Sequence, residues 1–240
     1  MSHDIATIPV QHNPMEVFLF APAGEGPHPG LVLCQHLPVG HTGLENDTVT
    51  LKTAQRYAEN GYAVAVPFIF HWWAKSADIE LKRAAFRDDW TRQDLDAAYA
   101  LLAARPGVDA KRIGIAGHCW GGRVAWLGAA TNKRYKACAI FYGGRVKLPM
   151  GKNSPPAIER AADIRCPVIG FFGNDDTNPT PADVDDYDAA LTKAGVEHVF
   201  HRYDGAGHGF FYWHRPLYRP EQAMDGWSKI WAFFGKHLAK

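Results

Sequence analysis

The sequence predicts an α/β fold with a mostly parallel central sheet and helices on both faces. Apolar runs alternate with helix-like stretches from one end of the 240-residue chain to the other, with no internal repeat. Most of the apolar runs are continuous rather than alternating, which is typical of strands buried on both faces. The length fits one α/β unit, so we expect a single domain over residues 1–240.

The expected elements follow one another in a regular order. Strands are predicted at 16–20, 30–34, 62–66, 112–116, 137–141, 167–172 and 198–203, and helices at 47–60, 88–104, 120–130 and 181–194. Gly61 and Gly195 are expected to cap the first and the fourth of these helices. A last helix carries apolar residues three or four apart, and they are expected to pack on the sheet: Met224, Trp227, Ile230, Trp231, Phe234 and Leu238.

Two segments do not fit this pattern. Residues 68–80 and 145–164 each follow a predicted strand and are long enough to form cap or lid loops. Ligands of open α/β sheets bind beyond the carboxyl ends of the strands, where these segments begin. We therefore expect the functional site at that edge.

The composition favours a folded protein with a small-molecule partner. There are 26 basic and 25 acidic residues and no basic block, so neither nucleic acid nor an anionic membrane is an expected partner. No apolar run approaches the roughly 18 residues of a membrane span. The polar segment 1–14 lacks the apolar core of a secretion signal. We expect a cytoplasmic protein, as a monomer or a homodimer.

The four cysteines are widely spaced and form no Cys-x-x-Cys pair, which argues against a disulfide framework and a structural zinc site. Cys34, Cys138 and Cys166 lie within predicted strands and are expected to be buried and inert. Cys119 lies instead between a predicted strand and a predicted helix. It is therefore the candidate for chemistry.

Residues 117–122 read Gly-His-Cys-Trp-Gly-Gly. A nucleophile on a sharp strand-to-helix turn needs small neighbours, because larger side chains would collide with the crossing backbone. Unpaired N–H groups and the dipole at a helix start favour the thiolate of Cys119, and the backbone N–H of Trp120 would face a developing oxyanion. The alternative is that Cys119 is one more buried small residue and the glycines only permit tight packing.

Two later turns supply partners for Cys119. Residues 205–210 read Gly-Ala-Gly-His-Gly-Phe just after the last predicted strand, so His208 is the predicted base. Asp175 and Asp176 follow the strand at 167–172. We favour Asp176 as the acid that orients the imidazole, because one of the two must point to solvent or cap the next helix. The order cysteine, aspartate, histidine is that of α/β-hydrolases, which is the fold we predict.

This triad predicts hydrolysis of an ester or a lactone through an acyl-cysteine. A thiolate is a strong nucleophile but also a good leaving group, so amides are poor candidates and enol, aryl and lactone esters fit. In this scheme Cys119 attacks the carbonyl carbon and His208 activates water for deacylation. No cofactor is required.

The elbow, the aspartate turn and the histidine loop together resemble the dienelactone hydrolase family, over nearly the whole chain from about Gly30 to His237. The resemblance implies a carboxymethylenebutenolidase-like enzyme that hydrolyses cyclic enol esters through an acyl-cysteine. It also implies that the backbone N–H of Leu37 is the second oxyanion donor, beside that of Trp120.

Two departures from the family bear on the substrate. The family has a glutamate that holds the resting thiol, and this chain has His36 there, which cannot supply a fixed negative charge. The family's arginines that grip a substrate carboxylate also find no match, since the fourth residue past His208 is Tyr212.

We therefore expect a neutral aromatic or cyclic ester to bind better than an anionic lactone. The predicted substrate contacts are His36, Trp72, Phe210 and Tyr212. The alternative is that an arginine of a neighbouring loop restores the anion site, the candidates being Arg145, Arg215 and Arg219.

Two other functions remain open at this stage. A metal-dependent hydrolase could use His36, His41 and His71, but these lack His-Glu-x-x-His spacing, and no metal is predicted. A non-catalytic thiol sensor or ligand-binding module could also use this fold, because a fold does not fix function. Such a module needs no nucleophile, acid and base in hydrolase order.

Overall fold

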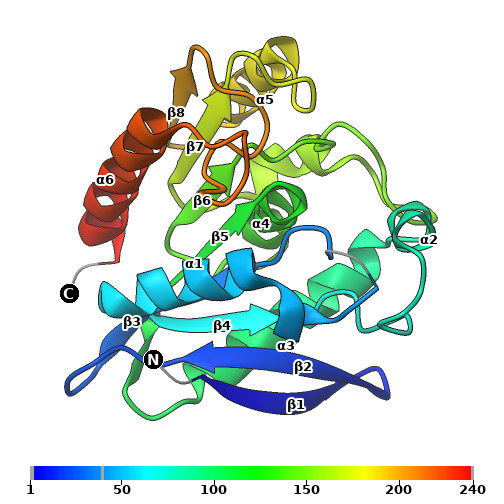
Figure 1. Cartoon of the computed structure of the whole chain (residues 1–240), viewed down its shortest axis with the longest axis vertical. Helices are drawn as coiled ribbons and strands as arrows, with labels where there is room; N and C mark the ends of the chain where they lie inside the picture. The colour runs from blue at the N-terminus through cyan, green and yellow to red at the C-terminus, as the bar shows by residue number, and fades with distance from the viewer. Residues whose placement is uncertain (1–2, 39–40, 239–240) are drawn as a thin grey trace.

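The computed structural model describes residues 3–38 and 41–238 and has the predicted α/β-hydrolase architecture. An eight-stranded sheet runs in the order β1-β2-β4-β3-β5-β6-β7-β8, from the bottom to the top of Figure 1. The strands from β4 to β8 in this order are parallel, while β2 pairs antiparallel with both β1 and β4. The strands are β1 (Asp4–Val10), β2 (Asn13–Phe20), β3 (His28–Cys34), β4 (Ala63–Pro67), β5 (Val108–His118), β6 (Cys138–Phe141), β7 (Val168–Gly173) and β8 (His198–Tyr203).

Helices cover both faces of this sheet. The α-helices are α1 (Thr48–Glu59), α2 (Ile79–Ala84), α3 (Asp88–Ala103), α4 (Trp120–Thr131), α5 (Pro181–Lys193) and α6 (Pro220–His237), and the 3-10 helices are η1 (Leu44–Asn46) and η2 (Ala157–Asp163). Tyr57 of α1 packs on Trp227 and Trp231 of α6, which places these two helices on one face. On the other face α4 contacts α3, and Trp126 of α4 packs on Tyr187 of α5.

The predicted elements are all present, with ends that differ by a few residues, and others were not predicted: β1, α2, η1 and η2. β1 is an edge strand whose residues are mostly exposed, and it lies within residues 1–14, which were interpreted as a polar segment. The segments expected as loops each include part or all of a short helix, α2 after β4 and η2 after β6.

Within α6 the prediction for Met224 was wrong, since its side chain is 56% exposed. The helix begins at Pro220, and Met224 lies on its outer side, while Trp227, Ile230 and Phe234 are buried. None of the described helices is long and apolar enough to cross a membrane.

A buried ion pair joins α3 to α4 behind the sheet edge that carries Cys119. The guanidinium of Arg123 donates to both carboxylate oxygens of Asp88, over 2.6 and 2.9 Å. It also donates to the backbone carbonyls of Arg145 and Leu148. Arg123 therefore fixes the first part of the irregular segment that follows β6.

Candidate active site

Cys119 lies at the carboxyl end of β5, directly before α4. Its φ of 57° and ψ of −121° are in a region that residues with side chains rarely adopt. The strained backbone is held in place, since the Cys119 N–H donates to Phe141 O over 2.9 Å and the Cys119 carbonyl accepts from Gly122 N over 2.9 Å. The predicted sharp strand-to-helix turn is confirmed.

The glycines of this turn are required by close backbone contacts. A Cβ on Gly117 would lie 2.0 Å from the carbonyl oxygen of Gly121, and one on Gly121 would lie 2.2 Å from that of Cys34. A Cβ on Gly122 would lie 2.7 Å from Cα of Gly143. These contacts confirm the predicted reason for small residues on both sides of Cys119.

The structure brings Cys119, His208 and Asp176 together. The Nε2 atom of His208 lies 3.0 Å from Sγ of Cys119, and its Nδ1 atom lies 2.9 Å from Oδ2 of Asp176. Asp176 is buried at the end of β7 and also accepts a hydrogen bond from the backbone N–H of Asn178. Asp175 is exposed, so its side chain is not the partner of the imidazole.

The surroundings of His208 favour its protonated form. Burial alone would lower the pKa of this imidazole, but hydrogen bonds and charge from Asp176 and Cys119 outweigh burial and raise the pKa to about 10. At neutral pH the ring is therefore an imidazolium held between a carboxylate and a sulfur atom.

The backbone N–H groups of Trp120 and Leu37 are the two that the sequence predicts as oxyanion donors. Trp120 is the first residue of α4, so its N–H has no acceptor within the helix. Leu37 follows β3 in a segment whose backbone passes close to the first turn of α4, since a Cβ on Gly121 would lie 2.7 Å from the carbonyl oxygen of Gln35. The indole of Trp120 packs on Phe86, with ring centroids 5.0 Å apart.

His36 and Tyr212 lie side by side, with ring centroids 5.5 Å apart, and both are buried. Nε2 of His36 lies 2.9 Å from Oδ1 of Asp47, which caps the N-terminus of α1. His36 thus comes from the segment after β3 and Tyr212 from the loop that carries His208. Two of the predicted substrate contacts therefore meet next to the triad loops.

The other two predicted substrate contacts are placed differently. Trp72 donates from its indole N–H to Asp94 Oδ2 over 3.0 Å and stacks on Trp90 at 4.7 Å, so its contacts tie it to α3. The prediction that Phe210 lines the pocket mouth was wrong, because its side chain is 0% exposed and packs on Tyr203 and Phe211. The side chain of Phe210 therefore belongs to the hydrophobic core.

Tyr142, which sequence reasoning missed, also belongs to the site. Its ring lies edge-on to the imidazole of His208 at 5.2 Å, and its φ is 38°, a strained value for a residue with a side chain. Its hydroxyl shares a hydrogen bond of 2.9 Å with Nδ1 of His118, whose pKa is lowered to about 3 by burial and by the nearby His36. In the sequence, the Gly143-Gly144 pair that follows Tyr142 after β6 is the feature that could have indicated a tight turn at this residue.

The three histidines considered as metal ligands do not converge. His36 pairs with Asp47, and His71 pairs with Asp94 over 2.9 Å, while His41 Nδ1 lies 3.1 Å from the carbonyl oxygen of Ser76. Across residues 3–38 and 41–238, no group of three or more His, Cys, Asp or Glu side chains is placed to hold a metal ion.

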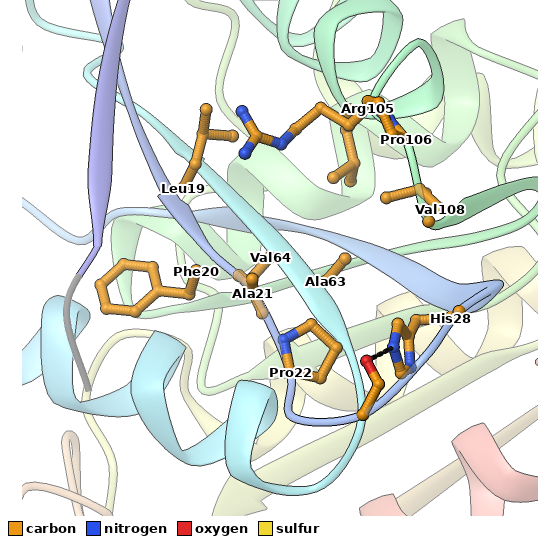
Figure 2. A pocket seen from close by; sticks show the side chains of 14 residues that line it. Leu19, Phe20, Ala21, Pro22, His28, Ala63, Val64, Arg105, Pro106 and Val108 are labelled. Carbon is orange, nitrogen blue, oxygen red and sulfur yellow. Dashed lines mark hydrogen bonds between the residues drawn. The ribbon is translucent and has the colours of Figure 1, made fainter.

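A separate pocket of about 170 Å³ lies at the opposite end of the sheet (Figure 2). The side chains around it come from β2, β4 and the starts of β3 and β5, among them Leu19, Val64, His28 and Val108. Its lining includes none of Cys119, His208 and Asp176. The reactive groups are therefore gathered at the carboxyl end of the parallel strands, as expected for this class of fold.

Known proteins resemble this chain over almost its whole length. A protein of Methylorubrum extorquens named "Putative carboxymethylenebutenolidase" is 31% identical over 96% of this chain and 79% of its own length. A Synechocystis protein of the same name is 30% identical over 98% of this chain and 96% of its own length.

Solved structures agree with these sequence relatives. The crystal structure of a "Putative Dienelactone Hydrolase" from Klebsiella pneumoniae has a TM-score of 0.85, with 30% identity and 98% coverage of both chains. The model of the dienelactone hydrolase family matches residues 15–238. The chain therefore belongs to the dienelactone hydrolase family and is a hydrolase of carboxylic esters or lactones.

Proposed function

We propose that this hydrolase cleaves a neutral ester or lactone through Cys119, His208 and Asp176 and an acyl-cysteine intermediate. The observation that carries the proposal is that the imidazole of His208 contacts both Sγ of Cys119, over 3.0 Å, and the buried carboxylate of Asp176, over 2.9 Å. A nucleophile, a base and an orienting acid need this mutual geometry.

In the proposed acylation, the imidazolium of His208 pairs with Cys119 in its nucleophilic thiolate form. The sulfur attacks the carbonyl carbon, and the carbonyl electrons move to the oxygen, which the N–H groups of Trp120 and Leu37 stabilise. The adduct collapses as the bond to the leaving oxygen breaks, and His208 donates its proton to that oxygen. The products of this step are the acyl-cysteine and a neutral imidazole.

Deacylation uses the same imidazole as a base. An acylated sulfur carries no charge, so the interactions with Cys119 that raised the pKa of His208 are lost. Neutral His208 takes a proton from water, the hydroxide adds to the thioester carbon, and the thiolate leaves with the imidazolium restored. Asp176 holds the ring orientation throughout.

The leaving group limits the range of substrates. The first adduct partitions between loss of the thiolate and loss of the alcohol oxygen, so productive collapse needs an oxygen that leaves about as well as sulfur. Enol, aryl and lactone esters meet this requirement and amides do not.

The contacts of Tyr212 and Arg219 favour a neutral substrate. Tyr212 offers a buried phenol where a carboxylate would need a guanidinium. Of the candidate arginines, Arg219 donates to the carbonyls of Gly205, Pro216 and Tyr218, so backbone groups occupy its guanidinium. Arg145 and Arg215 remain as the candidates for an anion site.

The test is intact-protein mass spectrometry during turnover of a neutral aryl ester. We expect a mass increase equal to the acyl group in the wild-type protein and none in Cys119→Ala. Turnover without an adduct on Cys119 would contradict the proposal. Full retention of activity in excess chelator is the expected control result, while its loss would support a metal-dependent reaction instead.

A further inference from the structure

The proposed mechanism does not use the His36 and Asp47 pair. Both side chains are buried, at 7% and 3% exposure, with Nε2 of His36 2.9 Å from Oδ1 of Asp47. Asp47 also accepts from the backbone N–H and the hydroxyl of Thr50, over 2.9 and 2.7 Å. Each carboxylate oxygen therefore has a partner at the start of α1.

Asp47 is held as a carboxylate. Burial raises the pKa of this group, but the hydrogen bonds from His36 and Thr50 and the charge of His36 outweigh burial and lower the pKa overall. A hydrogen bond to an ionised acceptor is stronger and shorter than a neutral one. The hydrogen bond to Asp47 therefore anchors the imidazole of His36 by holding it in one orientation.

The ring of His36 also contacts the loop that carries His208. The ring of His36 lies 5.5 Å from the ring of Tyr212, and Tyr212 lies 5.7 Å from Tyr142. Tyr142 in turn packs edge-on against His208. His36 therefore contacts both the start of α1 and the loop that carries the base.

The next residue after His36 is Leu37, whose N–H is the second oxyanion donor in the proposed mechanism. The first donor, Trp120, is positioned by α4, whereas Leu37 lies in neither a helix nor a strand. The position of the Leu37 amide therefore depends on the contacts of its own segment, which are the close approach of the Gln35 backbone to α4 and the side-chain anchors of its neighbours. His36 is its immediate neighbour and has such an anchor.

We infer that His36 and Asp47 are positioning residues, which hold the Leu37 amide where the oxyanion forms. This inference rests on the proposed function. A displacement of about 1 Å in a catalytic group can cost on the order of 10²-fold in rate. Loss of one oxyanion donor costs a similar amount, on the order of 10²- to 10³-fold. In this role His36 acts on the transition state through Leu37 and not as the substrate contact predicted from the sequence, so the pair leaves substrate binding and the nucleophile unaffected.

The experiment compares His36→Phe with His36→Gln, and Asp47→Ala with Asp47→Asn. Gln and Asn each keep a group that can bridge the two positions, while Phe and Ala remove it. We expect His36→Phe and Asp47→Ala to lower kcat by about 10- to 100-fold with KM within about twofold of wild type. His36→Gln and Asp47→Asn should recover most of this loss.

Two further measurements separate positioning from other roles. A trifluoromethyl ketone analogue of the ester adds the thiolate reversibly and places its oxygen where the oxyanion forms, so its Ki should rise as kcat falls. Iodoacetamide alkylates Cys119 without forming an oxyanion, so its rate should change by less than about twofold. His71→Phe disrupts another buried His–Asp pair, with Asp94, and should lower Tm without lowering kcat.

The inference is overturned if kcat is unchanged in His36→Phe, or if alkylation slows in parallel with kcat, because the pair would then act on the thiolate. It is also overturned if Asp47→Asn is as inactive as Asp47→Ala, which would make the charge itself essential. Activity in Cys119→Ala would instead overturn the proposed function. The two failures are therefore distinguishable.

Discussion

Asp175 and Asp176 are adjacent in the chain, yet only Asp176 reaches the imidazole of His208. Its Oδ2 atom lies 2.9 Å from Nδ1, and its side chain is 1% exposed, while Asp175 is exposed at the surface. Because neighbouring side chains of this turn point in different directions, only one carboxylate can orient the ring.

Asp176→Asn should therefore lower kcat far more than Asp175→Asn. An amide at 176 removes the charge that stabilises the imidazolium and can hold the ring in the wrong tautomer, so we expect a loss of roughly 10²- to 10⁴-fold. Asp175→Asn should remain within about twofold of wild type. Steady-state kinetics on an aryl ester measures both, and a reversed order would show that the turn is placed incorrectly.

Cys119→Ala should lower kcat by at least about 10³-fold, because members of a triad act as a unit. Cys34, Cys138 and Cys166 are buried, and burial raises the pKa of each thiol, so they are poor nucleophiles. Alanine at each of these three positions should leave kcat nearly unchanged. More than about a tenth of wild-type kcat in Cys119→Ala would refute the assignment.

A lactone acid and its methyl ester of equal ring size form a matched pair for the substrate proposal. We expect the methyl ester to have the higher kcat/KM, because the phenol of Tyr212 cannot form the paired hydrogen bonds of a guanidinium with a carboxylate. The opposite order, removed by Arg145→Ala or Arg215→Ala, would establish an anion site. Arg219→Ala should not affect the ratio, since its guanidinium is held by backbone carbonyls.

The pKa of His208 predicts how stability depends on pH. Its folded-state pKa of about 10 exceeds the ordinary pKa of 6.5. Between pH 6.5 and about pH 10 the folded protein therefore holds a proton on this ring that the unfolded chain releases. The stabilisation is fully present below about pH 6.5 and is lost as pH rises through about 10. Urea unfolding measures the free energy of unfolding of wild type and His208→Gln at pH 6 and at pH 10.5. At pH 6 the wild type should be the more stable of the two, and at pH 10.5 this difference should be lost. A constant difference would contradict the raised pKa.

The ion pair of Arg123 and Asp88 predicts a large loss of stability on removal of one partner. Arg123→Met leaves a buried carboxylate without its counter-charge, which typically costs about 3–5 kcal/mol. Lys236→Met breaks an exposed pair with Glu197, where the nitrogen and oxygen atoms are 3.1 Å apart, and should cost at most about 1 kcal/mol. Urea unfolding at pH 7 measures both, and equal losses would refute the argument from burial.

The fold was predictable because its central strands carry continuous apolar runs, such as β4 and β7, and its helices have clear starts and stops. β1 was missed because an exposed edge strand buries little apolar surface. Local chemistry likewise located Cys119 and His208, since a sharp turn and a glycine-rich loop each leave a short sequence signature.

Other parts of the site depend on contacts that leave no local signal. The bond between His36 and Asp47 spans an irregular segment without periodicity, so no pattern predicts it. Phe210 was assigned to the pocket because an aromatic residue in a loop can face either the core or a ligand, and its sequence position does not distinguish the two.

The order of the triad along the chain has a consequence for the newly made protein. Cys119 emerges 89 residues before His208, which follows the last strand of the sheet. At synthesis rates of roughly 5–20 residues per second, this interval lasts roughly 4–18 seconds. During that time the ribosome carries a cysteine that has neither the imidazole nor the finished sheet edge that would activate it. The proposed triad is thus complete only when translation has passed β8, and a product interrupted before β8 lacks the base His208.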